Sequence, residues 1–209
     1  MASYEAVLFD FDGVLVDSEP IHWACWCEIL QGYGLQLDWE TFRDNCIGIT
    51  DRRMLTFLSA QAAPPIDVDQ LFTEYPRKKA MFRERMLHTY TMPGEVVELV
   101  ASVHRDYKTA VVTSSAHTEV APILEASGLL PHLDTCVYGN DVSNFKPAPD
   151  PYLLAASRLN VKRALVVEDS DAGEASGRAA GFPVLRLRSQ ADLLPEVRAA
   201  LAQTLDFNA

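Results

Sequence analysis

The stretch FDFDGVLVDSEP, residues 9–20, decides how this chain is interpreted. It continues the apolar run AVLF (6–9), which is short and unbroken, as is typical of a parallel strand buried on both faces. Two aspartates, Asp10 and Asp12, stand two positions apart where that strand ends. Gly13 follows them directly and permits a sharp turn of the backbone. The stretch therefore predicts a buried strand that carries two carboxylates into a turn.

Similar apolar runs recur along the chain, and two of them also end in polar clusters. Residues 109–113 (TAVVT) lead into Ser114, and residues 164–168 (ALVVE) lead into Asp169. Two further candidate strands are TCVYG (135–139) and PVLRL (183–187). Helical patterns lie between the runs, at residues 94–105, 118–128, 150–160 and 172–181. Strands that alternate with helices predict an α/β fold with a parallel sheet, in which the polar clusters meet at the carboxyl edge.

The segment between the first strand and the next βα unit has a different character. It contains no convincing strand run but several helical periods, at residues 21–34, 41–47, 51–61 and 69–90. We therefore expect two domains. The first is an α/β core made of residues 1–17 and 91–209, and the second is a small helical bundle, residues 18–90, inserted after the first strand.

The overall composition excludes several classes of partner. The formal net charge is −11, which argues against binding to nucleic acid or to an anionic membrane surface. We see no basic segment followed by a long apolar one at the N-terminus, and no run of 18 apolar residues. Four cysteines lack zinc-site spacing and are expected to be buried thiols. These features predict a cytoplasmic protein.

Carboxylates, hydroxyls and a lysine gather at the predicted strand ends: Asp10, Asp12, Thr113, Ser114, Lys146, Glu168 and Asp169. Crowded carboxylates repel one another, and a hard cation such as Mg²⁺ relieves that repulsion. The lysine and the hydroxyls can hold an anion beside the metal. One carboxylate can attack phosphorus while another moves the proton of the leaving group. Each cluster alone also fits a turn, a helix cap or a surface lysine, but their common position favours a phosphoryl-transfer site.

Four motifs in this order carry a family resemblance: FDFDGVLVDSEP, VVTSSA (111–116), KPAPDPY (146–152) and VVEDSDAG (166–173). The chain resembles the haloacid dehalogenase-like superfamily of phosphohydrolases. It is most similar to the branch with a helical cap inserted after the first strand, which holds sugar-phosphate phosphatases, phosphoglycolate phosphatases and β-phosphoglucomutases. The resemblance implies a Rossmann-like parallel sheet with helices on both faces, plus the inserted cap.

The resemblance also implies a role for each matching residue. Asp10 would be the nucleophile and Asp12 the general acid and base. Mg²⁺ would be held by the Asp10 carboxylate, the Asp12 main-chain carbonyl and Asp169, with Glu168 nearby. The transferring phosphoryl group would be bound by Thr113, Ser114 and Lys146. The implied activity is that of a monomeric, Mg²⁺-dependent phosphatase that hydrolyses a small phosphomonoester, such as a sugar phosphate, through an aspartyl-phosphate.

The predicted cap carries three candidate substrate-binding residues, His22, Arg52 and Lys78. His22 and Lys78 match cap positions of the β-phosphoglucomutases, so a phosphosugar mutase is the alternative activity. The mutase pattern places an arginine where GITDRR (48–53) has Asp51, with Arg52 one position later. A shift of one residue on a helix turns a side chain by about 100°, and this departure favours the phosphatase. A non-catalytic binding module is a third, more distant alternative.

Overall fold

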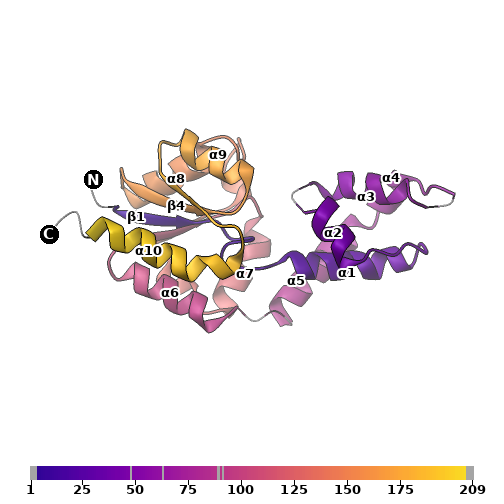
Figure 1. Cartoon of the computed structure of the whole chain (residues 1–209), viewed down its shortest axis with the longest axis horizontal. Helices are drawn as coiled ribbons and strands as arrows, with labels where there is room; N and C mark the ends of the chain where they lie inside the picture. Colours follow the sequence, from indigo (N-terminus) through magenta and orange to yellow (C-terminus); the bar gives the residue numbers. More distant parts are fainter. Residues whose placement is uncertain (1–3, 48, 63, 89, 91, 206–209) are drawn as a thin grey trace. The chain divides into compact units, whose positions relative to one another are not determined.

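Two units divide the chain: Met1–Asp17 together with Thr91–Ala209, and Ser18–Tyr90 (Figure 1). We call them the α/β unit and the helical unit. The structure is a computed structural model, and it describes residues 4–47, 49–62, 64–88, 90 and 92–205. None of the helices in these ranges is long and apolar enough to span a membrane.

The α/β unit is built around a sheet of five strands, as far as the described residues show. Their bounds are β1 Ala6–Phe9, β2 Lys108–Val112, β3 Thr135–Val137, β4 Ala164–Glu168 and β5 Val184–Arg186. The strand order is β3-β2-β1-β4-β5, and every neighbouring pair is parallel. The predicted α/β fold with a parallel sheet is therefore confirmed. Because β1 is the central strand, the residues that follow it reach the middle of the carboxyl edge.

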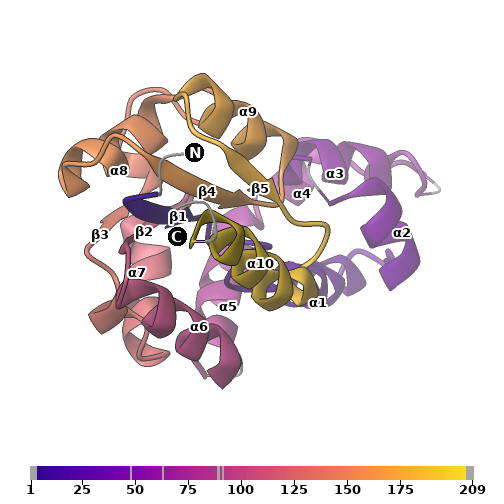
Figure 2. The same cartoon turned by 60° about the vertical axis from the view of Figure 1, so that its left-hand side comes forward.

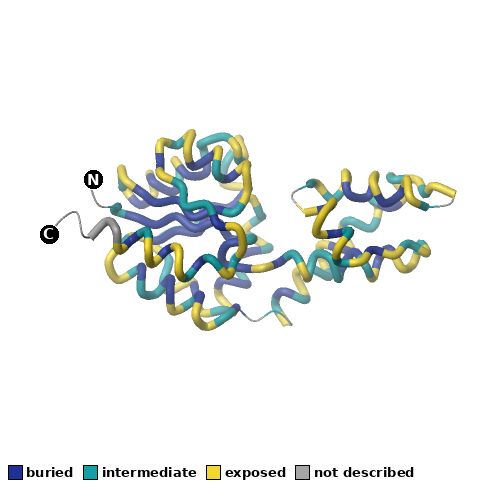
Figure 3. Tube along the Cα trace, viewed as in Figure 1, coloured by how far each residue is buried: buried dark blue, intermediate teal, exposed yellow. Residues whose placement is uncertain are grey.

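Helices cover both faces of this sheet. Their bounds are α6 Gly94–His104, α7 His117–Ala126, α8 Asp150–Leu159, α9 Asp171–Ala179 and α10 Leu193–Leu205. Short 3₁₀ segments lie at Leu130–His132, Gly139–Asp141 and Gln190–Asp192. Helices α8 and α9 lie over one face, and α6 and α10 lie over the other (Figures 1 and 2). Tyr152, Ala155 and Leu159 recur at helical spacing along α8 and pack against the strands. Figure 3 shows buried strands beneath helices whose outer sides are exposed.

Five helices make up the described part of the helical unit: α1 Glu19–Gln31, α2 Trp39–Asn45, α3 Asp51–Ser59, α4 Val68–Phe72 and α5 Tyr75–His88. The sequence predicted one continuous helical segment over residues 69–90, but the structure has two helices there, α4 and α5. Residue 89 lies outside the described ranges. Pro76 explains the break, because a proline inside a continuous helix has no N–H to donate to the carbonyl of Phe72 and clashes with it. The proline instead occupies the second position of α5, where it is tolerated.

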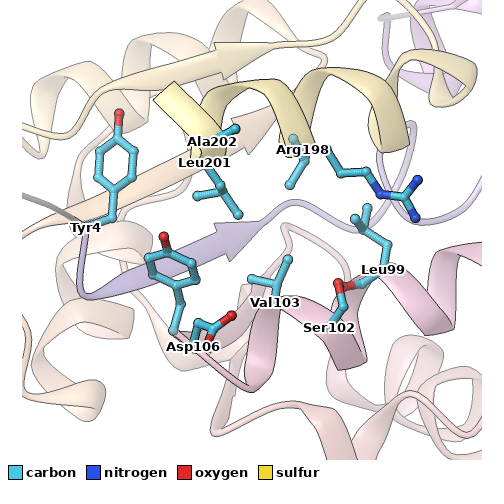
Figure 4. A pocket seen from close by; sticks show the side chains of 10 residues that line it. Tyr4, Leu99, Ser102, Val103, Asp106, Arg198, Leu201 and Ala202 are labelled. Carbon is cyan, nitrogen blue, oxygen red and sulfur yellow. The ribbon is translucent and has the colours of Figure 1, made fainter. Parts of the chain in front are cut away.

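One pocket of the α/β unit, about 530 Å³, lies between α6 and α10 (Figure 4). Its wall is mostly apolar, with Leu99, Val103 and Leu201 among the residues that line it. Tyr4 and Asp106 also line it, and they precede β1 and β2 in the chain. The pocket therefore lies toward the amino edge of the sheet, opposite the edge where the predicted reactive residues emerge.

Candidate active site

Asp10 stands at the centre of the carboxyl edge. Its backbone N–H donates to the Val167 carbonyl at 2.9 Å, which continues the pairing of β1 with β4 for one more residue. The residue is only 8% exposed. Its Oδ1 accepts a hydrogen bond from Lys146 Nζ at 2.6 Å, although 136 positions separate the two residues. The sheet thus joins two predicted site residues that the sequence keeps far apart.

Lys146 holds this edge together. Its Nζ donates to Asp10 Oδ1 at 2.6 Å, to Glu168 Oε1 at 2.7 Å and to the Val112 carbonyl at 2.9 Å. An ammonium has three N–H donors, so all of them are engaged. Burial alone would lower the pKa of Lys146, but the Asp10 and Glu168 carboxylates outweigh it and raise that pKa. The lysine therefore stays charged although its side chain is only 5% exposed.

Glu168 ends β4 and is completely buried. Its Oε1 accepts from Lys146 Nζ at 2.7 Å and from the Tyr152 hydroxyl at 2.8 Å. Its Oε2 accepts from the N–H groups of Asp169 and Ser170 and from the Ser170 hydroxyl, at 3.0–3.2 Å. A carboxylate offers about four lone-pair positions, so these donors saturate it. Glu168 is therefore a positioning residue for Lys146. Burial alone would raise the pKa of Glu168, but the Lys146 ammonium and the hydrogen bonds outweigh it and lower that pKa.

Two glycines make room for the carboxylates at this edge. A Cβ on Gly173, in the first turn of α9, would lie 1.8 Å from Glu168 Cδ. A Cβ on Gly13 would lie 1.9 Å from Asp169 Oδ2, and Gly13 has a φ of +76°. Both values are far below an ordinary contact between heavy atoms. The glycine of FDFDG is therefore needed for its backbone conformation and also for its lack of a side chain.

Three acidic side chains form a candidate cation site. Ligand oxygens of Asp10, Glu168 and Asp169 all lie within 4.8 Å of one another. Burial raises the pKa of Asp10 to about 8, although Lys146 opposes the effect. Burial and the neighbouring Glu168 charge raise the pKa of Asp169 to about 6. A raised pKa means that the ionised carboxylate is destabilised. A hard divalent cation stabilises the ionised form, so this set of carboxylates fits Mg²⁺. Because the oxygens of Glu168 are occupied, Asp10 and Asp169 are the carboxylates best placed to serve it.

The second aspartate and the hydroxyls follow β1 and β2. Asp12 Oδ2 accepts from the Ser115 hydroxyl at 3.1 Å. Thr113 is buried, and its Oγ1 accepts from the Ser115 N–H at 3.0 Å. Ser114 is exposed, and its carbonyl passes so close to Gly139 that a Cβ there would lie 2.2 Å away. The sequence interpretation chose the first serine of VVTSSA and missed Ser115, the one that contacts Asp12.

Tyr152 was also missed as a site residue. Its hydroxyl donates to Glu168 Oε1 at 2.8 Å, and Lys146 Nζ lies 5.0 Å from the centre of its ring. The only signal was its place in KPAPDPY, six positions after the lysine, where the helical pattern explains it equally well as a core residue. Tyr152 therefore holds the Glu168 carboxylate in place, and that carboxylate in turn orients Lys146.

In the helical unit, two of the three predicted residues come together. Lys78 Nζ lies 2.8 Å from His22 Nδ1 and donates to Asp51 Oδ1 at 3.2 Å. The indole N–H of Trp26 donates to the same oxygen of Asp51 at 2.6 Å. Burial, followed by the Lys78 charge, lowers the pKa of His22 to about 3, so its ring is neutral. All four residues line one small pocket.

Arg52 does not join this group. Its guanidinium pairs with Asp69 and lies 5.1 Å from the centre of the Phe72 ring. The side chain is about half exposed, at 54%, and it is not one of the residues that line the His22 pocket. The structure therefore separates Arg52 from His22 and Lys78.

Two features define the class of α/β enzymes to which this protein belongs. The carboxyl edge of its parallel sheet presents a buried aspartate, a lysine and further carboxylates, and a helical insertion follows the first strand. The chain belongs to one family within that class, the haloacid dehalogenase-like hydrolases, whose family model matches residues 7–187. The match confirms the resemblance seen in the four motifs. It also confirms the expected enzyme class, a hydrolase with relatives that are named phosphatases.

Individual relatives agree with this assignment. The fructose-1-phosphate phosphatase YqaB of Escherichia coli K12 is 33% identical over 188 residues, which cover 88% of this chain and 97% of that protein. The phosphorylated carbohydrates phosphatase of Thermotoga maritima is 33% identical over 184 residues, 85% of this chain and 82% of that protein. Among solved structures, a HAD family hydrolase of Deinococcus radiodurans R1 with bound phosphate and sodium superposes with a TM-score of 0.78 at 28% identity, covering 98% and 97% of the two chains.

Proposed function

We propose that this protein is a Mg²⁺-dependent phosphatase that hydrolyses a small phosphomonoester, a sugar phosphate, through an aspartyl-phosphate on Asp10. The observation that carries the proposal is the buried contact of Asp10 with Lys146, beside Asp169, at the centre of the carboxyl edge. The names of two relatives, which are phosphatases of phosphorylated sugars, support the substrate class.

The reaction has two displacement steps at phosphorus. An Asp10 oxygen attacks the phosphorus, the bond from phosphorus to the ester oxygen breaks, and Asp12 gives its proton to the leaving alkoxide. Asp12 then takes a proton from water, whose oxygen attacks the phosphorus and breaks its bond to Asp10. Inorganic phosphate leaves, and both aspartates return to their starting states.

Other residues of the chain prepare this chemistry. Lys146 orients Asp10 and sets a positive charge beside the position where phosphoryl oxygens gather charge. The hydroxyls of Thr113 and Ser114 donate to those oxygens. Bound Mg²⁺, held by Asp10, Asp169 and the main-chain carbonyl of Asp12, supplies further compensation of negative charge.

We further propose that the helical unit acts as the cap and binds the part of the substrate away from the phosphate. His22 and Lys78 are the residues we assign to that task, since they meet in one pocket. Arg52 is the third candidate from the sequence and is kept with the same test. Alanine at each position should lower kcat/KM on the best substrate, and an unchanged value would remove that residue from the assignment. The cytoplasmic location and the monomeric state stay predictions.

The test is phosphate release from a panel of sugar phosphates and other phosphomonoesters, with Mg²⁺ and with EDTA. We expect release only with the metal, loss of turnover in Asp10→Asn, and a fall of roughly 10²- to 10⁴-fold in Asp12→Asn. Asp106→Asn, a matched change at the opposite edge of the sheet, should turn over normally. Wild-type turnover by Asp10→Asn would overturn the covalent mechanism. Conversion of β-glucose 1-phosphate to glucose 6-phosphate without net release would identify the mutase instead.

A further inference from the structure

The pocket of the helical unit has the size of a single small ring. Its volume is about 140 Å³, close to the roughly 150 Å³ of an apolar cavity that accepts one benzene molecule. One part of its wall is apolar, made by Phe42, Ile49 and Met54. The other part carries the polar groups of His22, Asp51, Lys78 and Glu19. A wall of this mixed kind suits a ligand that has both C–H surface and hydroxyl groups.

The polar part of the wall carries both hydrogen-bond donors and acceptors. The Lys78 ammonium can only donate, so His22 Nδ1 accepts from it and the ring proton of the neutral His22 lies on Nε2. Asp51 Oδ1 accepts from both Trp26 and Lys78, while Oδ2 has no hydrogen-bond partner among the described residues. The pocket thus offers N–H donors from His22 and Lys78 and a carboxylate acceptor from Asp51. A hydroxyl group, which both donates and accepts, can satisfy this set.

The charge of the pocket does not suit an anion. Lys78 is the only lysine or arginine among the residues that line it, whereas Asp51 and Glu19 both carry carboxylates. Asp51 lies directly against the ammonium of Lys78, a residue that is only 3% exposed. A phosphate dianion in this pocket would meet a cation that is already paired with Asp51, and it would lie beside the Asp51 carboxylate. Repulsion between like charges at a binding site strongly disfavours the binding of a ligand that carries the same charge.

We propose that this pocket binds the uncharged, hydroxylated end of the substrate, and that Asp51 makes it reject a second phosphate group. The inference rests on the proposed phosphatase function and narrows its substrate to sugar monophosphates. Asp51 is therefore a specificity-determining residue.

Two sugars that differ by one phosphate test this. Wild-type protein should hydrolyse fructose 1-phosphate with a higher kcat/KM than fructose 1,6-bisphosphate. Asp51→Asn keeps the size of the side chain and an acceptor for Trp26 but removes the charge. It should raise kcat/KM for the bisphosphate relative to the monophosphate by at least about 10-fold, equal to about 1.4 kcal/mol. Asp44→Asn, the same change at an exposed carboxylate of the helical unit outside the pocket, should leave the ratio unchanged.

A second readout does not depend on turnover. All three tryptophans of the chain lie in the helical unit, and Trp26 lines the pocket. Titration with the two sugars should change the tryptophan fluorescence of the wild type at lower concentrations of the monophosphate, and Asp51→Asn should reduce that preference. Turnover with an unchanged ratio in Asp51→Asn would overturn the inference and leave the phosphatase intact. If no phosphomonoester released phosphate, the proposed phosphatase function would be wrong. The titration would then test the pocket by itself, and equal fluorescence responses to the two sugars would overturn the inference as well.

Discussion

Replacing Gly173 with alanine tests the positioning of the buried acidic group most directly. The added methyl would lie 1.8 Å from Glu168 Cδ and Oε1, and 2.1 Å from Oε2. A normal carbon–carbon contact begins near 3.5 Å, so the Glu168 carboxylate or helix α9 must move by more than an ångström. Glu168 accepts five hydrogen bonds in its present position, including those of Lys146 and Tyr152. It cannot move that far without losing some of them.

The size of the effect follows from these contacts. Overfilling a packed site costs about 1–3 kcal/mol, and each lost hydrogen bond to a charged group costs about 1.5–3 kcal/mol. Alanine otherwise favours a helix over glycine by up to about 1 kcal/mol. We expect a net loss of about 3 kcal/mol for Gly173→Ala. For a chain of this length, each kcal/mol moves Tm by roughly 2–4 °C, so Tm should fall by roughly 6–12 °C.

Two measurements check this prediction. Thermal unfolding should report the fall in Tm, and phosphate release with Mg²⁺ should decrease because Lys146 loses the carboxylate that orients it. Gly94→Ala is the matched control, since that glycine begins α6 and a Cβ there would have no neighbour within 4 Å. It should leave Tm unchanged or slightly higher. If Gly173→Ala were as stable and as active as the wild type, Glu168 would not be held as we describe.

Two further predictions concern single contacts. Tyr152→Phe removes one donor from Glu168 and should lower the free energy of unfolding by about 1.5–3 kcal/mol, measured by urea unfolding; an unchanged midpoint would show that the hydroxyl contributes nothing. His22 has a pKa of about 3 in the folded state against 6.5 normally, so the unfolded chain binds a proton that the folded one does not. Stability should therefore fall as the pH drops from 6.5 toward 3, by up to about 1.4 kcal/mol per pH unit. His22→Gln should weaken this dependence in urea unfolding followed by tryptophan fluorescence, and an identical slope in both proteins would contradict the assignment.

Much of the fold and of the site could be predicted because the decisive signals are local. Each strand is a short apolar run, and the polar residue that ends it must emerge at the carboxyl edge of a parallel sheet. This reasoning brings Asp10, Glu168 and Asp169 together before any coordinates exist. Lys146 was included because its motif matched the family, and the structure places its Nζ against Asp10 and Glu168.

The remaining features depend on geometry that a sequence does not contain. Apolar runs identify strands but not their neighbours, so the strand order could not be predicted. Ser114 and Ser115 are chemically equal, and only the path of the loop decides which of them faces Asp12. Helix α10 was not predicted, and Pro195 in its first turn, where a missing N–H is harmless, makes its helical pattern harder to detect.

The central place of β1 has a consequence for how the protein is made. Ala6 pairs with Lys108 on one side and with Ala164 on the other, so both partners of the strand are more than 100 residues away. During synthesis, all of the helical unit leaves the ribosome before β1 can pair with anything. Contacts between such distant segments form slowly, and domains fold as units in the order of their synthesis. The aspartate at the reactive centre is therefore made well before the segments that surround it in the folded protein.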